Sequence, residues 1–175
     1  MRAFHGCSVV AISVSLAASA AAVIPPPGKW ARDYKKWERV TARPLHLPNP
    51  TAMLCAAAGQ SDPNPHRNYH FRVYVNPTAR QAMVAEKNPH FPPGSALVKE
   101  KLASPDDPRP VLLTVMSRPE ASTGGDSAWT YYVLDPDGKV QSGATDHCRR
   151  CHEKVRGQDF VFRTYLSKAQ LAALR

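Results

Sequence analysis

Tyr69-His70-Phe71-Arg72-Val73-Tyr74-Val75 alternates apolar or aromatic side chains with more polar ones. A period of two residues places one set on each face of a β-strand, so the segment predicts a half-buried strand. Asn76-Pro77 follows at once and is typical of a helix start, with a capping side chain and a proline in the first turn. We expect that helix to end near Lys87.

Other segments repeat this mixture of strand-like and helical patterns. Four more strands are predicted at residues 95–102, 111–117, 129–134 and 139–142. Short helices are predicted at residues 30–40, 51–58, 145–154 and 168–174, the last capped by Ser167. The tight turn Asp135-Pro136-Asp137-Gly138 joins the final two strands. The fold class is therefore α+β: an antiparallel sheet of about five strands with flanking short helices, among them a helix near the C-terminus at residues 145–154.

Cys148-Arg149-Arg150-Cys151-His152 matches the Cys-x-x-Cys-His pattern of covalent haem attachment. Each thiol can add to one vinyl group of the same porphyrin, and the adjacent histidine supplies an axial nitrogen to the iron. We predict one haem c, attached through Cys148 and Cys151, with His152 as the metal ligand. A zinc site would need a second ligand pair, and the chain has no other Cys-x-x-Cys. A thioredoxin-like dithiol would instead follow an early strand of a βαβ unit.

The N-terminus has the features of a secretory signal peptide. A short polar start containing Arg2 and His5 precedes an apolar run, and small residues allow cleavage near Ala20 or Ala22. We predict a signal peptide over residues 1–22, a linker over 23–29 and a single haem domain over 30–175. Export to the periplasm agrees with the haem motif, because bacteria attach haem c outside the cytoplasm. A retained membrane anchor is the alternative, although the apolar run is short for a span.

Cysteine use and charge limit the other classes of function. With two cysteines committed to haem and Cys7 removed, Cys55 has no partner, which excludes a disulfide framework. Its apolar neighbours favour a buried, inert thiol over a redox or dimer-forming role. The formal charge of +9 is scattered along the chain, so we expect no nucleic-acid binding. A basic surface would favour an acidic redox partner or anions, or would simply be solvated.

Five blocks of the chain form a recognisable set: residues 70–76, 91–101, 113–116 and 129–135, and the haem motif joined to residues 159–165. Together these blocks resemble the cytochrome P-460 and cytochrome c′-beta family. The most specific part is the glycine turn Phe91-Pro92-Pro93-Gly94, followed by Val98-Lys99-Glu100 on a strand. The resemblance covers about Trp30 to Leu166. It implies a β-rich mono-haem domain, often a homodimer, with His152 as proximal ligand and an open distal side.

The resemblance also implies a role for Lys99. In the hydroxylamine-oxidising members, the lysine of the Val-Lys-Glu block is bonded through its side-chain nitrogen to the porphyrin rim. Such a bond requires an unprotonated amine, and therefore a lysine whose pKa is lowered by desolvation. From the residues alone, Lys99 would be an ordinary strand lysine that faces solvent. Both interpretations stay open at this point.

One departure from the family pattern bears on catalysis. The enzymatic members use an acidic side chain near the distal face to handle substrate protons. The corresponding strand here, residues 112–117, contains no carboxylate, and Thr114 or Ser117 can only hydrogen-bond a ligand. Glu100 and Glu120 remain as substitutes if the strand register differs. The departure moves the expectation from hydroxylamine oxidation toward reversible ligand binding.

Three functions compete: oxidation of hydroxylamine, binding of nitric oxide at a five-coordinate haem, and electron transfer by a six-coordinate haem. Apolar residues that could line a ligand pocket, or belong to the sheet core, are Phe71, Phe91, Met116 and Tyr131. Candidate sixth ligands are His66, His70, Met83, His90 and Met116. We expect a periplasmic mono-haem protein that binds or oxidises small nitrogen compounds and has a periplasmic redox partner. A six-coordinate electron-transfer cytochrome is the alternative, and enzymatic turnover stays open.

Overall fold

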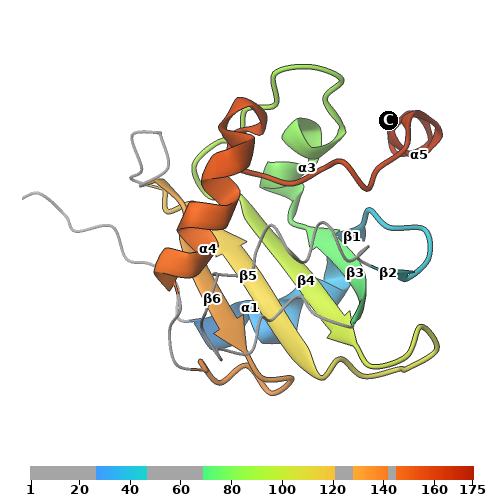
Figure 1. Ribbon diagram of the computed structural model, residues 1–175, viewed down its shortest axis with the longest axis vertical. Coiled ribbons are helices and arrows are strands. Elements are labelled where there is room, and N and C mark those ends of the chain that lie inside the picture. The colour runs from blue at the N-terminus through green and yellow to red at the C-terminus, as the bar shows by residue number, and fades with distance from the viewer. Residues whose placement is uncertain (1–26, 47–68, 121–127, 142–144) are drawn as a thin grey trace, which may run out of the picture.

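The computed structural model describes residues 27–46, 69–120, 128–141 and 145–175. The predicted signal peptide, the helix predicted at residues 51–58, Cys55 and His66 lie outside these described residues. Within them, an antiparallel sheet separates two groups of helices (Figure 1). This arrangement confirms the predicted α+β class.

The sheet is built around four of the predicted strands, with two short strands at its edge. In the described residues it comprises β1 (Glu38–Arg39), β2 (Leu45–His46), β3 (His70–Val75), β4 (Ala96–Leu102), β5 (Leu112–Ser117) and β6 (Thr130–Leu134). The strand order is β1-β3-β4-β5-β6, and β2 also pairs with β3. All of these pairings are antiparallel.

The register of the sheet assigns neighbouring residues of β4 to opposite faces. Lys99 lies opposite Val73 on β3 and opposite Thr114 on β5. Directly paired residues point to the same side of a sheet, whereas successive residues alternate. Lys99 and Thr114 therefore share one face, and Glu100 lies on the other.

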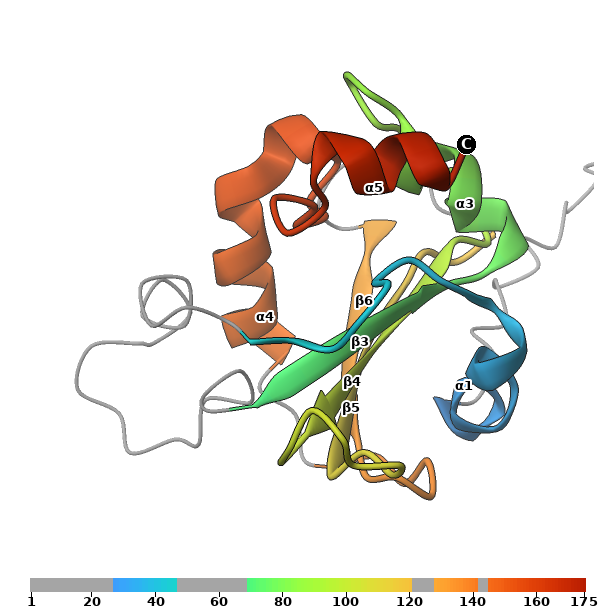
Figure 2. The ribbon, with the colours of Figure 1, turned by 90° about the vertical axis from the view of Figure 1, so that its right-hand side faces the viewer.

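The helices cover both faces of the sheet (Figure 2). Helix α1 (Pro27–Asp33) and the 3₁₀ turn η1 (Tyr34–Lys36) lie on the Glu100 face, where Trp30 and Tyr34 join an apolar cluster with Val98 and Val115. The other helices are α3 (Pro77–Val84), α4 (Thr145–His152), the 3₁₀ segment η3 (Glu153–Gln158) and α5 (Lys168–Ala173). Among the residues that the structure describes, no helix is long and apolar enough to cross a membrane.

Two helix starts follow the predicted capping chemistry. The Asn76 side chain accepts a hydrogen bond from the backbone of Ala79, and α3 begins at the predicted proline. Ser167 and Gln170 form a capping box at the start of α5. Helix α3 ends at Val84, three residues before the predicted end at Lys87. Its last carbonyls bind the buried Arg163 guanidinium, which holds that end in place.

Two other predicted elements are wrong in part. The helix predicted at residues 30–40 ends at Asp33, because Glu38 and Arg39 pair with the edge of β3 as strand β1. The closing strand predicted at residues 139–142 contributes only one bridge, between Leu134 and Val140, in the described part of the segment. The helix that carries the haem motif ends at His152 and continues as 3₁₀ turns.

Candidate cofactor site

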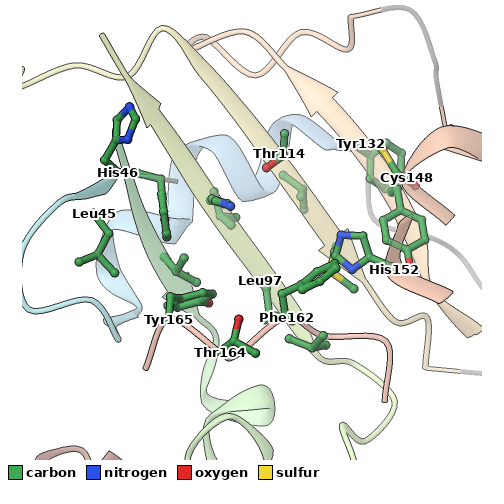
Figure 3. Close-up of a pocket in the computed structure, with 18 residues that line it drawn as sticks. Leu45, His46, Leu97, Thr114, Tyr132, Cys148, His152, Phe162, Thr164 and Tyr165 are labelled. Atoms are coloured by element: carbon green, nitrogen blue, oxygen red, sulfur yellow. The ribbon is translucent and has the colours of Figure 1, made fainter. Parts of the chain in front are cut away.

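A cavity of about 450 Å³ lies between the Lys99 face of the sheet, helix α4 and residues 161–165. Figure 3 shows His152 and Phe162 on one side of this cavity and Leu45 and His46 at the opposite end. Most of its lining is aliphatic or aromatic, as in pockets that bury a large organic ligand. Its volume falls within the range of about 300–1,000 Å³ that is typical of such pockets.

The imidazole of His152 forms part of the cavity wall at the end of α4. Its ring packs against Tyr131 and Phe162, with centroid distances of 5.1 and 5.0 Å. Nδ1 donates a hydrogen bond to the carbonyl oxygen of Phe160 at 2.6 Å. Because a carbonyl oxygen can only accept, the proton of the neutral ring is on Nδ1, and the lone pair of Nε2 remains for a metal.

Electrostatics keep the His152 ring neutral. Burial lowers its pKa to about 4; the hydrogen bond to Phe160 opposes that shift, and the charge of Lys99 adds to it. A neutral imidazole with a carbonyl partner on its second nitrogen is the usual form of a metal-ligating histidine. The geometry therefore suits an axial ligand.

Helix α4 places both cysteines of the motif close to His152. Cys148 lines the cavity, and it shares a helix face with His152 because the two residues are four positions apart. Cys151 is buried, with 5% of its surface exposed, and it does not belong to the cavity lining. The structure thus brings Cys148 and His152 to one wall of the cavity, and Cys151 is buried beside them in the same helix.

Lys99 faces the cavity rather than bulk solvent. Its Nζ lies 4.1 Å from the centroid of the Phe71 ring, within the range of a cation–π contact. Both side chains line the cavity from the sheet. The interpretation of Lys99 as an ordinary solvent-facing lysine is therefore wrong for this structure.

Among the described residues that line the cavity, none is an aspartate or a glutamate. Glu100, a suggested substitute base, is fully buried on the opposite face of the sheet, where it accepts a hydrogen bond from the Tyr34 hydroxyl at 2.7 Å. Lys35 also binds this carboxylate. Glu120, the other substitute, is exposed and does not line the cavity. Thr114 lines it, but Ser117 does not.

Only some of the predicted pocket and ligand candidates reach the cavity. Phe71, Met116 and Tyr131 line it, whereas Phe91 packs in the core against Trp129, at a centroid distance of 5.7 Å. Met116 is paired with Tyr131, whose ring contacts His152, so it lies on the His152 side of the cavity.

The other proposed sixth ligands are placed elsewhere. His90 is largely exposed near Asp159, and Met83 is fully buried in the core. The His70 ring contacts the His46 ring at a centroid distance of 5.0 Å and a tilt of 60°, but only His46 is part of the cavity lining.

His46, Phe162 and Tyr165 are among the lining residues that were not found from the sequence. His46 belongs to a strand of two residues, which is too short to show a period. Phe162 and Tyr165 lie in irregular backbone after η3, where no periodicity assigns a face. Tyr165 packs edge-on against Phe71, and burial raises the pKa of its hydroxyl.

The donor set and the apolar cavity fit a covalently held porphyrin. Among the described residues, no group of three or more His, Cys, Asp or Glu side chains is placed to hold a bare metal ion. A protein-family model described as Cytochrome P460 matches residues 31–163. No curated protein matches the chain.

Proposed function

The chain belongs to the cytochrome P460 family, and from that membership we propose that it is a periplasmic mono-haem protein that binds small nitrogen compounds such as nitric oxide. The family implies a haem cofactor and a c-type cytochrome. The single attachment site, the ligand and the compartment are parts of the proposal. The observation that carries it is the apolar cavity beside His152, whose described lining includes Lys99 but no carboxylate.

Cys148 and Cys151 would hold the haem through two thioether bonds, and His152 would ligate its iron through Nε2. Their common position on one side of α4, with Cys148 and His152 at the cavity wall, supports this assignment. The bound haem would supply a redox-active iron with one exchangeable coordination position. The chain has one such motif, which supports a single haem.

Lys99 would contact or be bonded to the haem rim. Its Nζ lies inside the apolar cavity, where the Phe71 ring replaces part of its hydration. Bond formation at nitrogen would require this amine to lose its proton.

Ligand binding is favoured over hydroxylamine oxidation because the described cavity wall offers no strong proton acceptor. Thr114 can donate a hydrogen bond to a bound ligand, but its hydroxyl is a poor base. Phe71 and Tyr165 would exclude water from the same space. Binding of a neutral diatomic molecule needs only a hydrogen-bond donor and an apolar space that excludes water.

Electron transfer by a six-coordinate haem is the second candidate, because His46 adds an imidazole to the cavity wall. Absorption spectra of the purified reduced protein separate the two functions. Nitric oxide should change the spectrum of wild-type protein, and His46→Ala should leave that response intact. A low-spin spectrum that ignores nitric oxide and becomes responsive in His46→Ala would instead establish electron transfer.

Turnover of hydroxylamine with an artificial electron acceptor tests the enzymatic alternative. We expect none above the rate of free haem at equal concentration. The compartment is tested by cell fractionation and by N-terminal sequencing of the mature chain, which should begin near Ala21 or Val23. An acidic periplasmic redox partner and a homodimer complete the proposal, and light scattering of the haem-loaded protein tests the dimer.

A further inference from the structure

The chain makes an unusual turn directly after η3. Asp159 and Phe160 both have positive φ angles, of 50° and 64°. A left-handed conformation costs a residue other than glycine about 1–2 kcal/mol, and it is rare for a bulky side chain such as Phe160. Two such residues in succession persist only when their surroundings hold them in place.

This turn directs a carbonyl group at the candidate iron ligand. The backbone N–H of Phe160 donates to the carbonyl of Val155 at 3.2 Å, which folds the chain back onto η3. The carbonyl of Phe160 then accepts the Nδ1 proton of His152 at 2.6 Å. The backbone conformation of Phe160 therefore sets the position of the His152 hydrogen-bond partner.

Asp159 fastens the turn to the sheet. Its carboxylate accepts hydrogen bonds from the backbone N–H of Phe91 and from the Arg118 guanidinium, both at 2.8 Å. Its backbone carbonyl accepts a hydrogen bond from the Trp129 indole at 3.0 Å. These anchors lie before β4, at the end of β5 and at the start of β6, and none belongs to α4.

Arg118 completes the anchor from a buried position. Only 2% of its side chain is exposed, and the nitrogen that binds Asp159 also donates to the carbonyl of Phe91. A charge-assisted bond of this kind, removed from water, is stronger and more directional than a surface ion pair. Arg118 thus connects the turn at Asp159 to the end of β5 and to the backbone at Phe91.

We propose that Arg118 and Asp159 are positioning residues for the axial ligand, acting through the Phe160 carbonyl on the imidazole of His152. This inference rests on the proposed ligation of haem iron by His152. A hydrogen bond from Nδ1 orients the ring, selects its tautomer and makes it a stronger donor. A stronger donor favours ferric over ferrous iron, so the ion pair lowers the reduction potential.

Two variants of the haem-loaded protein test the proposal: Asp159→Asn and Arg118→Met. Asparagine tolerates a left-handed backbone and removes only the charge, so it isolates the ion pair. We expect each variant to shift the reduction equilibrium toward ferrous iron, Arg118→Met by roughly tenfold, which is ~59 mV for one electron. Resonance Raman spectra of the ferrous protein should show a lowered iron–histidine stretching frequency. Arg118→Lys should recover part of both changes.

Arg80→Met is the matched control. Arg80 forms an ion pair with Glu38 at 2.5 Å, each side chain is about one-third exposed, and neither lines the cavity. Its loss should change the unfolding temperature and leave the potential and the Raman band unchanged. Wild-type values of both in Asp159→Asn and in folded Arg118→Met would overturn the proposal.

If Arg118→Met fails to fold, Asp159→Asn decides alone. His152→Ala separates this test from the proposed ligation. An iron–histidine band that persists in His152→Ala would reject His152 as the ligand, whereas a band that is lost there but insensitive to Asp159→Asn would reject only the role of the ion pair.

Discussion

Lys99 and Glu100 are neighbours in β4, but their side chains lie on opposite faces of the sheet and in different surroundings. Lys99 projects into an apolar cavity, with its ammonium group over the Phe71 ring. Glu100 is fully buried on the other face among Tyr34, Lys35 and Arg72. The charge of Lys99 lies where a cofactor and its ligand would bind. The charge of Glu100 is compensated by the side chains that surround it.

The difference indicates separate tasks for the two faces. Burying a charge is costly unless opposite charges and hydrogen bonds compensate for it, as they do around Glu100. The Glu100 face therefore joins η1 to the sheet and contributes to the stability of the fold. The Lys99 face leaves space in its core, and protein interiors do so mainly at binding sites.

The largest expected effect follows from removing the buried carboxylate. Glu100→Ala leaves the Arg72 guanidinium without its ion-pair partner and the Tyr34 hydroxyl without its acceptor. Breaking a buried ion pair in this way costs about 3–5 kcal/mol, and the half-exposed Lys35 tempers that value. Urea denaturation measures the loss. The haem spectrum of the folded protein should not change.

Glu86→Ala is the control for Glu100→Ala. Glu86 pairs with Arg175 at the surface, with 69% of its side chain exposed, so its removal should cost less than about 1 kcal/mol. Equal losses in the two variants would mean that the Glu100 face has no special structural role.

A smaller loss is expected for Tyr34→Phe, which removes one hydrogen bond to the buried carboxylate. A hydrogen bond to a charged group contributes about 1.5–3 kcal/mol. Burial, together with the hydrogen bond to Glu100, raises the pKa of the Tyr34 hydroxyl above its usual value of 10.0. Above pH 10 the unfolded chain therefore loses this proton before the folded one, and stability falls as the pH rises.

The pH dependence of the free energy of unfolding tests the role of the Tyr34 hydroxyl on the Glu100 face. Urea denaturation between pH 8 and 11 should show a smaller alkaline loss of stability in Tyr34→Phe than in wild type. Tyr74 lies on the same face, and burial also raises its pKa, so part of the loss should remain. An identical profile in wild type and Tyr34→Phe would contradict the assigned role of the Tyr34 hydroxyl.

Alternation along residues 69–75 was enough to predict strand β3, because this strand is long enough to show a period of two. The α+β class followed from the mixture of predicted strands and short helices. Strands β1 and β2 were missed because two residues carry no period. The aromatic spacing of Trp30, Tyr34 and Trp37 predicted a longer helix. In the structure, tertiary pairing with β3 outweighs that local preference.

The candidate site was likewise predictable from the sequence only in part. The haem motif lies in one continuous segment, so Cys148 and His152 were identifiable without a structure. The contacts of His152 come from outside the motif, from Phe160, Phe162 and Tyr131. No local sequence pattern encodes the turn geometry and strand register that place them. Whether Glu100 faced the cavity depended on the strand register, and the pairing of Lys99 with Thr114 answered it.

Lys99→Met should show the opposite pattern to Glu100→Ala, with little change in stability and a changed haem spectrum. The variant removes a cation–π contact of about 0.5–2 kcal/mol but adds apolar surface to an apolar site, so we expect a stability change within about 1 kcal/mol. Because Lys99 is proposed to contact or be bonded to the haem rim, the absorption spectrum should shift. A red-shifted Soret band that survives denaturation in wild type and is lost in Lys99→Met would establish the bond.

Lys35→Met is the matched lysine on the opposite face. Lys35 also lies over aromatic rings, at 5.2 Å from Tyr34 and 5.7 Å from Tyr74. Its removal should lower stability and leave the spectrum unchanged. A spectral change in Lys35→Met as large as that in Lys99→Met would mean that the two faces are not functionally separate.

The smallest expected effect belongs to Thr114, which lies beside Lys99 on the cavity face. Thr114→Val keeps the shape and removes only the hydroxyl, whose hydrogen bond to a bound ligand would contribute about 0.5–1.5 kcal/mol. Nitric oxide should therefore dissociate about 2–10 times faster, as measured by stopped-flow absorption with a ligand trap. Thr164→Val, at an exposed position of the cavity lining, should leave the rate unchanged. If Thr164→Val accelerates dissociation and Thr114→Val does not, the ligand lies away from the sheet, and the Lys99 face is then not its binding surface.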